Sequence, residues 1–203
     1  MPSLRRIVLV RHGETDGESS IRFHGTTDVA LAPEGREQMK AVARQLRFES
    51  FDALFSSPLR RAWGAAWIVG GGSEISLVPQ FREVDFGRWE GLTREEIEAR
   101  DPVLAKDWQD GAEGFEYPGG ESRRDFRARV ESGLDALLAS GLRSVLVVAH
   151  KGVIRAIGEK LTGEALDREA PPLGGVVVLT RDGDGSWFAG RRGSNPPALA
   201  EQA

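Results

Sequence analysis

Residues 5–13 read RRIVLVRHG, an apolar and β-branched run that stops abruptly at an arginine, a histidine and a glycine. A continuous apolar run of this kind is typical of a strand that is buried on both faces, as in a parallel sheet. Residues 145–152 repeat the pattern as VLVVAHKG. The two segments therefore predict two buried strands, which end at His12 and His150.

Further periodic segments fill the rest of the chain. Apolar runs at residues 51–55, 75–78 and 174–180 predict three more strands, and DGDG at 182–185 predicts a hairpin turn rather than a calcium loop. Helical spacing predicts helices over residues 33–47, 59–69, 121–138 and 153–161, with shorter pieces over 93–100 and 103–108. Strands that alternate with helices predict right-handed βαβ units. We therefore expect an α/β fold, a three-layer α/β/α sandwich with a mainly parallel sheet.

The chain has 203 residues, a length that predicts one domain, which we place at residues 1–190. Residues 81–120 interrupt the alternation with a polar stretch rich in glutamate, glycine and tryptophan. We expect this insertion to form a lid over the carboxyl ends of the strands. Residues 191–203 are predicted to form a flexible tail.

The composition excludes several classes of function. Without cysteine, the chain can use neither a cysteine nucleophile nor a thiolate metal site. Its net charge of -4 argues against a nucleic-acid-binding protein, which would carry a basic excess. The apolar runs are too short for a membrane span or for the core of a signal peptide. We therefore expect a cytoplasmic protein with no membrane and no nucleic acid as a partner.

Charged side chains gather at the predicted strand ends. Because ligands of open parallel sheets bind outside the carboxyl ends of the strands, His12 and His150 are expected to face one pocket. Arg11 and Lys151 stand beside them, and Arg61 lies near the start of the helix that follows the strand predicted at residues 51–55. One guanidinium group can donate hydrogen bonds to two phosphate oxygens at once. The set predicts a pocket for a tetrahedral dianion, although each histidine could also simply end a strand.

An acidic pair lies within FREVDFGRWEG, residues 81–91. Glu83 and Asp85 stand there among aromatic residues, and such surroundings are found around general acids. Charged loops that contain aromatic residues are common, so this pattern alone leaves the role of the two carboxylates open.

The order of these motifs resembles the histidine phosphatase superfamily, the phosphoglycerate-mutase-like enzymes of branch 1. RHGET at residues 11–15 is similar to the family signature, and RFHGTTDVAL at 22–31 resembles its substrate loop. SPLRRA at 57–62 is similar to the second arginine motif, and EVDFGRWEG at 83–91 to the segment that opens with the proton donor. PGGES at 118–122 and VAH at 148–150 complete the order. The PGGES segment looks most like that of alpha-ribazole phosphatases and broad-specificity phosphatases.

The resemblance implies a metal-independent phosphomonoester hydrolase that acts through a phosphohistidine on a small phosphorylated metabolite, without a cofactor. His12 would be the nucleophile, and Glu83 would protonate the leaving oxygen and then activate water. Arg11, Arg61 and His150 would hold the phosphoryl oxygens. The further residues expected to bind substrate are Thr15, Arg22, His24, Gly25 and Lys151.

Two positions depart from the family pattern. Glu18 stands where asparagine is common, so its loop is expected to be shifted or used differently, and Lys151 stands where glycine is common. Two alternatives stay open: a phosphoglycerate-type mutase, which returns the phosphoryl group to a second hydroxyl, and a pseudoenzyme that binds phosphorylated ligands without turnover. The sequence also leaves a homodimer open.

Overall fold

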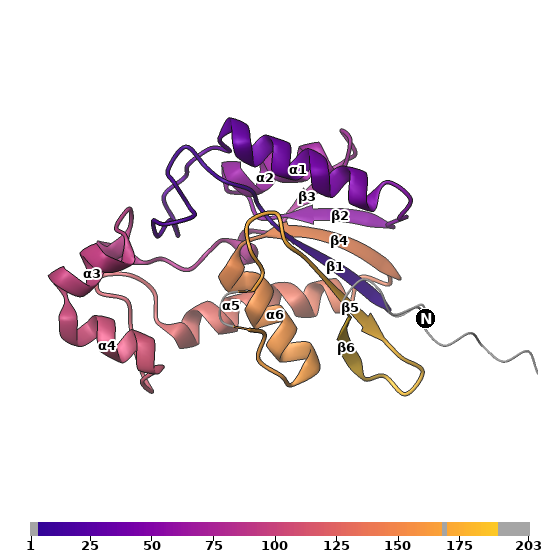
Figure 1. Cartoon of the computed structure of the whole chain (residues 1–203). Helices are drawn as coiled ribbons and strands as arrows, with labels where there is room; N and C mark the ends of the chain where they lie inside the picture. The colour runs from indigo at the N-terminus through magenta and orange to yellow at the C-terminus, as the bar shows by residue number, and fades with distance from the viewer. Residues whose placement is uncertain (1–3, 168–169, 191–203) are drawn as a thin grey trace, which may run out of the picture.

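The structure is a computed structural model, and it describes residues 4–167 and 170–190. Its strands form one mixed sheet in the order β3-β2-β4-β1-β5-β6 (Figure 1). They are β1 (Arg6–Arg11), β2 (Ala53–Ser56), β3 (Ile75–Leu77), β4 (Ser144–Ala149), β5 (Val176–Arg181) and β6 (Trp187–Gly190). The first four in chain order run parallel, whereas β5 and β6 are antiparallel to their neighbours. The mainly parallel sheet is confirmed, with an antiparallel edge that the sequence analysis did not predict.

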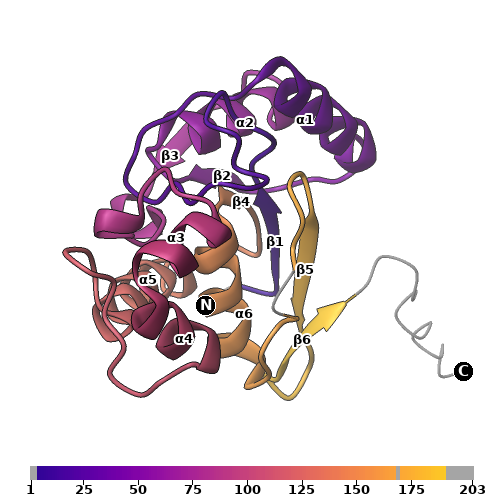
Figure 2. The same cartoon turned by 60° about the vertical axis from the view of Figure 1, so that its left-hand side comes forward.

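Long helices cover both faces of the sheet. They are α1 (Pro33–Leu46), α2 (Arg60–Val69), α5 (Arg123–Leu138) and α6 (Lys151–Thr162). α1 and α2 lie on one face, and α5 and α6 lie on the other (Figure 1, Figure 2). The shorter helices are α3 (Arg94–Arg100), α4 (Pro102–Asp110), and the 3-10 turns η1 (Pro79–Phe81) and η2 (Gly87–Trp89). The expected three-layer α/β/α sandwich is confirmed.

The side chains of β1 alternate between two apolar cores. Ile7 and Leu9 lie in the core beneath α5 and α6, and Val8 and Val10 lie in the core beneath α1 and α2. All four side chains are fully buried. Because successive side chains of a strand point to opposite faces, a strand covered on both faces must be apolar at every position. This alternation explains why residues 7–10 form an unbroken apolar run.

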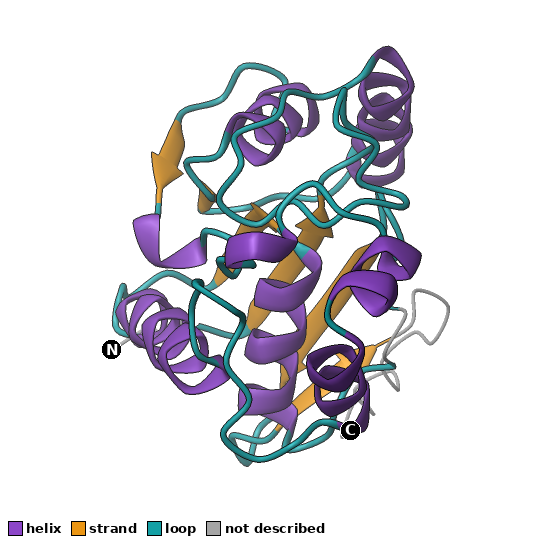
Figure 3. Ribbon diagram, turned by 90° about the vertical axis from the view of Figure 1, so that its left-hand side faces the viewer, coloured by secondary structure: helices purple, strands orange, loops and turns teal. Residues whose placement is uncertain are grey.

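The insertion at residues 81–120 lies beyond the carboxyl ends of the parallel strands, where α3 and α4 stand apart from the helices that cover the sheet (Figure 1). Figure 3 views the molecule from the side on which α3 and α4 lie in Figure 1. Trp89 forms the centre of this insertion; it is fully buried and packs against the rings of Phe115 and Tyr117. The Trp89 indole N–H also donates to the Asp101 carboxylate at 2.8 Å. The aromatic residues of the segment predicted to form a lid therefore pack on one another and join the same apolar core as Ile7 and Leu9.

The hairpin predicted at residues 182–185 is present between β5 and β6. The Asp182 carboxylate accepts hydrogen bonds from the backbone amides of Gly185 and Ser186 at 3.0 and 2.9 Å. The tail predicted at residues 191–203 lies outside the described residues. Across residues 4–167 and 170–190, no helix is long and apolar enough to cross a bilayer.

Candidate active site

His12 and His150 lie side by side because β1 and β4 are parallel neighbours in register. Arg11 pairs with Ala149, and the backbone amide of His12 donates to the Ala149 carbonyl at 3.1 Å. The two imidazole ring centroids are 5.2 Å apart. Only 4% of His12 and none of His150 is exposed. The structure thus brings together the two strand-end histidines that the sequence singled out.

Hydrogen bonding holds the His12 imidazole in one tautomer. Its Nδ1 lies 2.7 Å from the backbone oxygen of Gly13, which can only accept, so Nδ1 carries the proton and Nε2 keeps a lone pair. Burial first, and then the positive charges of Arg61 and Arg11, hold the pKa of His12 well below its ordinary value of 6.5. His12 is therefore neutral near pH 7, and its Nε2 is available as a nucleophile.

His150 is also neutral, and Ser57 orients it. Burial, followed by the charge of Arg61, holds the pKa of His150 well below its ordinary value. Its Nε2 lies 2.8 Å from the Ser57 hydroxyl, which also accepts the Leu59 amide at 3.3 Å. When the hydroxyl donates to Nε2, the proton of the neutral His150 ring lies on Nδ1. This buried Nδ1 has no hydrogen-bond partner among the described residues, so it can donate to a ligand oxygen.

Arg61 is fully buried near the start of α2. Burial lowers the pKa of Arg61, whereas the nearby carboxylates of Glu83 and Glu90 act in the opposite direction. Its Nε is buried and, within the described part of the chain, has no hydrogen-bond partner. Its two Nη atoms donate to the backbone carbonyls of His24, Gly25 and Thr27 at 2.7 to 2.8 Å. The guanidinium is therefore fixed by a backbone loop and keeps one donor for a ligand.

Glu90 organises the loop that fixes Arg61, a role that the sequence analysis missed. Its carboxylate accepts the backbone amides of Gly25, Thr26, Thr27 and Phe86 at 3.0 to 3.2 Å, and the hydroxyl of Thr27 as well. The loop passes so close that a Cβ on Gly25 would stand 1.8 Å from the Val84 carbonyl oxygen. The only sequence signal for Glu90 is its place within residues 83–91, because its partners are backbone amides.

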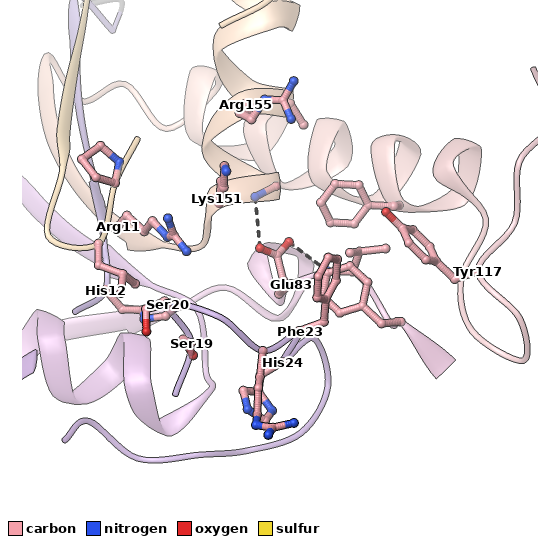
Figure 4. A pocket seen from close by; sticks show the side chains of 18 of the residues that line it. Arg11, His12, Ser19, Ser20, Phe23, His24, Glu83, Tyr117, Lys151 and Arg155 are labelled. Carbon is pink, nitrogen blue, oxygen red and sulfur yellow. Dashed lines mark hydrogen bonds between the residues drawn. The ribbon is translucent and has the colours of Figure 1, made fainter. Parts of the chain in front are cut away.

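Glu83 lies across the site from Arg11 and His12 (Figure 4). The residue is 6% exposed, and its carboxylate accepts the backbone amides of Val84 and Gly152, both at 3.0 Å. A Cβ at Gly152 would lie 2.4 Å from Glu83 Oε1, so any larger residue there would displace the Glu83 carboxylate. The first turn of α6, which follows His150 directly, thus fixes the position of Glu83 relative to the two histidines.

A cavity of about 830 Å³ opens beside His12. The predicted site residues that line it are Arg11, His12, Arg22, His24, Glu83 and Lys151. Arg61 and His150 are buried and do not line it. Thr15 and Gly25 do not line the cavity either. The Thr15 hydroxyl is hydrogen-bonded to the Ser19 hydroxyl at 2.7 Å. The Gly25 amide donates to the Glu90 carboxylate, and the Gly25 carbonyl accepts from the Arg61 guanidinium. The structure therefore separates predicted site residues that line this cavity from predicted site residues that are buried behind its wall, among them Arg61 and His150 with their unpartnered donors.

Glu18 occupies a special backbone position, and its side chain does not line the cavity. Its φ of 58° lies in the left-handed region, which asparagine adopts more easily than glutamate. The Glu18 carboxylate contacts the Arg22 guanidinium at 3.2 Å, and Arg22 also contacts Glu96 of α3 at 3.0 Å. Arg22 therefore connects its loop to the insertion.

Known proteins resemble this chain in sequence and in fold. The family described as the histidine phosphatase superfamily (branch 1) matches residues 7–191. The chain belongs to this family. A glucosyl-3-phosphoglycerate phosphatase of Mycolicibacterium vanbaalenii is 35% identical to it, over 98% of this chain and 91% of the relative. The solved mycobacterial glucosyl-3-phosphoglycerate phosphatase is 32% identical, with a TM-score of 0.74 over 91% of this chain and 96% of that one.

The fold is also shared with the alpha-ribazole phosphatase of Shigella flexneri, which is 24% identical, with a TM-score of 0.77 over 91% of this chain and 94% of that one. These similarities confirm the predicted family. They also confirm the predicted activity, a phosphatase that hydrolyses phosphomonoesters. The catalytic and binding roles of the individual residues stay predictions. Across the described residues, no three histidine, aspartate or glutamate side chains form a group that could hold a metal ion.

The state of His12 can be tested by nitrogen NMR. In the free enzyme at pH 6.5, we expect the ¹⁵N shifts of a neutral imidazole that is protonated at Nδ1, since the pKa of His12 is lowered well below that value. The His12→Gln spectrum identifies the resonance. A His12 that titrates at or above pH 6.5, or that carries its proton on Nε2, would contradict the assignment.

The supporting role of Glu90 can be tested with vanadate, a phosphate analogue. Glu90→Gln removes the charge that gathers the loop amides, so Arg61 loses its fixed position and vanadate inhibition should weaken by roughly tenfold. Glu95→Gln makes the same charge change on the exposed face of α3 and should leave inhibition unchanged. Equal inhibition constants for Glu90→Gln and the wild-type enzyme would show that the loop holds Arg61 without Glu90.

Proposed function

We propose that this phosphatase acts through a phosphohistidine at Nε2 of His12, on a small phosphorylated metabolite, without a metal or an organic cofactor. The observation that carries the proposal is the Nδ1 hydrogen bond to Gly13, which leaves Nε2 unprotonated in a buried imidazole whose pKa is lowered. We further propose that the protein works in the cytoplasm. A homodimer stays a prediction.

In the first step, the lone pair of His12 Nε2 forms a bond to phosphorus while the phosphorus–oxygen ester bond breaks. The ester oxygen takes the proton of the Glu83 carboxyl group, so the product leaves as an alcohol. Arg11, Arg61 and His150 offer donors to the phosphoryl oxygens and stabilise the charge that they carry.

In the second step, water attacks the phosphohistidine. Glu83, now a carboxylate, takes a proton from this water as the new phosphorus–oxygen bond forms and the nitrogen–phosphorus bond breaks. The step releases inorganic phosphate and returns His12 to its neutral form and Glu83 to its acid form. The cations of Arg11, Arg61 and Lys151 supply the positive charge that metal ions supply in other phosphoryl-transfer sites.

Two assays separate this proposal from its alternatives. A mutase would isomerise a phosphoglycerate without releasing phosphate, whereas the proposed hydrolase releases one phosphate for each ester consumed. A pseudoenzyme would bind vanadate and release no phosphate from any ester. The first substrates to assay are sugar phosphates and nucleotides, together with glucosyl-3-phosphoglycerate and alpha-ribazole phosphate, which the names of the relatives suggest.

The role of Glu83 depends on how much help the leaving oxygen needs. Glu83→Gln should slow phosphorylation of His12 by alkyl phosphates by ~10²–10⁴, because an alkoxide is a poor leaving group without a proton. Nitrophenyl phosphate should be much less affected, because nitrophenolate leaves without one. The burst phase measures this step apart from the later attack of water.

Asp85→Asn is the matched control, since it neutralises the neighbouring carboxylate of the same segment. Asp85 accepts the Gly87 amide at 2.8 Å and does not line the cavity. It should show no selectivity between the two leaving groups. Equal losses on both substrates for Glu83→Gln, or selectivity at Asp85 instead, would reject Glu83 as the acid.

A further inference from the structure

The cavity extends well beyond the atoms that the phosphoryl chemistry needs. From His12 it continues along α6 past Lys151 to Arg155 (Figure 4). Its volume of about 830 Å³ falls in the range of small-molecule sites, which hold ligands far larger than one phosphate ion. The non-phosphate part of the substrate must therefore be read by the outer walls.

One outer wall is aromatic and gives no charge selectivity. Its members come from the substrate loop, the insertion and α5: Phe23, Phe86, Trp108, Tyr117 and Phe126. Phe23 packs edge-on against Phe86 and Trp108, so these rings support one another. Such a wall accepts the carbon skeleton of a ligand through apolar contact.

The other outer wall is cationic, but neighbouring carboxylates offset most of its charges. Arg94 contacts Glu98 at 2.9 Å, and Arg127 contacts Glu159 at 3.1 Å. Arg22 is held by two carboxylates, as described above. These three lining arginines therefore have their counterions within the protein. Arg123 also lines the cavity, and its guanidinium is held by the Trp108 backbone carbonyl at 2.7 Å and by the face of the Phe115 ring.

Arg155 differs from them. It lines the cavity on α6, yet its guanidinium forms no ion pair and no hydrogen bond with any residue in 4–167 or 170–190. Its Nε is buried from solvent and has no hydrogen-bond partner in the part of the chain that the structure describes. A buried guanidinium donor without an acceptor is costly, and a bound anion removes this cost. Arg155 is also four residues after Lys151, so the two cations lie on the same face of α6.

We propose that Arg155 binds a second anionic group of the substrate, so that the physiological substrate is a phosphomonoester that also carries a carboxylate or a second phosphate. The proposal rests on the proposed function, since it takes the His12 side of the cavity as the place of the scissile phosphate. Arg155 is then a specificity-determining residue that does not touch the reacting atoms.

Matched pairs of esters test this proposal as competitive inhibitors of nitrophenyl phosphate hydrolysis. 3-Phosphoglycerate differs from glycerol 3-phosphate only by a carboxylate in place of a hydroxymethyl group, and phosphoserine adds a carboxylate to phosphoethanolamine. Glucose 1,6-bisphosphate adds a phosphate to glucose 6-phosphate. The wild-type enzyme should bind the more anionic member of at least one kind of pair about tenfold more tightly, the effect of one charged hydrogen bond.

Arg155→Gln should abolish this preference and leave the inhibition constant of orthophosphate unchanged. Arg155→Lys keeps the charge without the planar fork and should retain part of the preference. Arg124→Gln is the matched control, because the Arg124 side chain is 94% exposed on α5 and does not line the cavity. It should keep the full preference of the wild-type enzyme.

The outcomes separate the two proposals. A preference in the carboxylate pairs alone identifies a carboxylate as the second anion, and a preference in the bisphosphate pair alone identifies a phosphate. Equal binding within every pair by the wild-type enzyme, or an unchanged preference in Arg155→Gln, overturns the role of Arg155 while phosphatase activity stands. If no ester is hydrolysed, the proposed function fails, and calorimetric binding of the same pairs still decides whether Arg155 selects a second anion.

Discussion

Two central strands, β1 and β4, pair in parallel from Arg6 opposite Ser144 to Arg11 opposite Ala149, and the rest of the site depends on this register. Both strands are buried on two faces, so a shift by one residue would exchange the side chains of the two cores. Because packing fixes the register, it also fixes His12 beside His150 at the strand ends. The site therefore gains the rigidity of the sheet rather than that of a loop.

The same burial sets the charges of the site. It keeps both histidines neutral beside positively charged arginines, as the roles proposed for them require: His12 as the nucleophile and His150 as a donor. Burying Arg61 is costly, and three backbone carbonyls held by Glu90 offset that cost. Substrate selectivity is left to the outer cavity, where Arg155 has no counterion among the described residues. The residues proposed for the chemistry thus lie around His12, and the residue proposed for selectivity, Arg155, lies in the outer part of the same cavity.

The sequence predicted what periodicity and local motifs encode. The run before His12 predicted a two-faced strand because every position in it is apolar, and the motif around it predicted the family. The antiparallel direction of β5 was missed because an apolar run carries no direction, and β6 was missed because it is short and mostly exposed. Glu90 and Ser57 act through partners that only the fold brings to them, so spacing could not reveal them. Arg155 looks like any of the 27 basic residues until the cavity is known.

Trapping the covalent intermediate tests the central claim most directly. Enzyme mixed with labelled ester and quenched in denaturant at alkaline pH within the first turnover should carry one acid-labile phosphate, which peptide mapping places on His12. The His12→Ala enzyme should fold and carry none. Labelled phosphate on another residue, or phosphate release without any labelled protein during the first turnover, would contradict a phosphohistidine mechanism at this site.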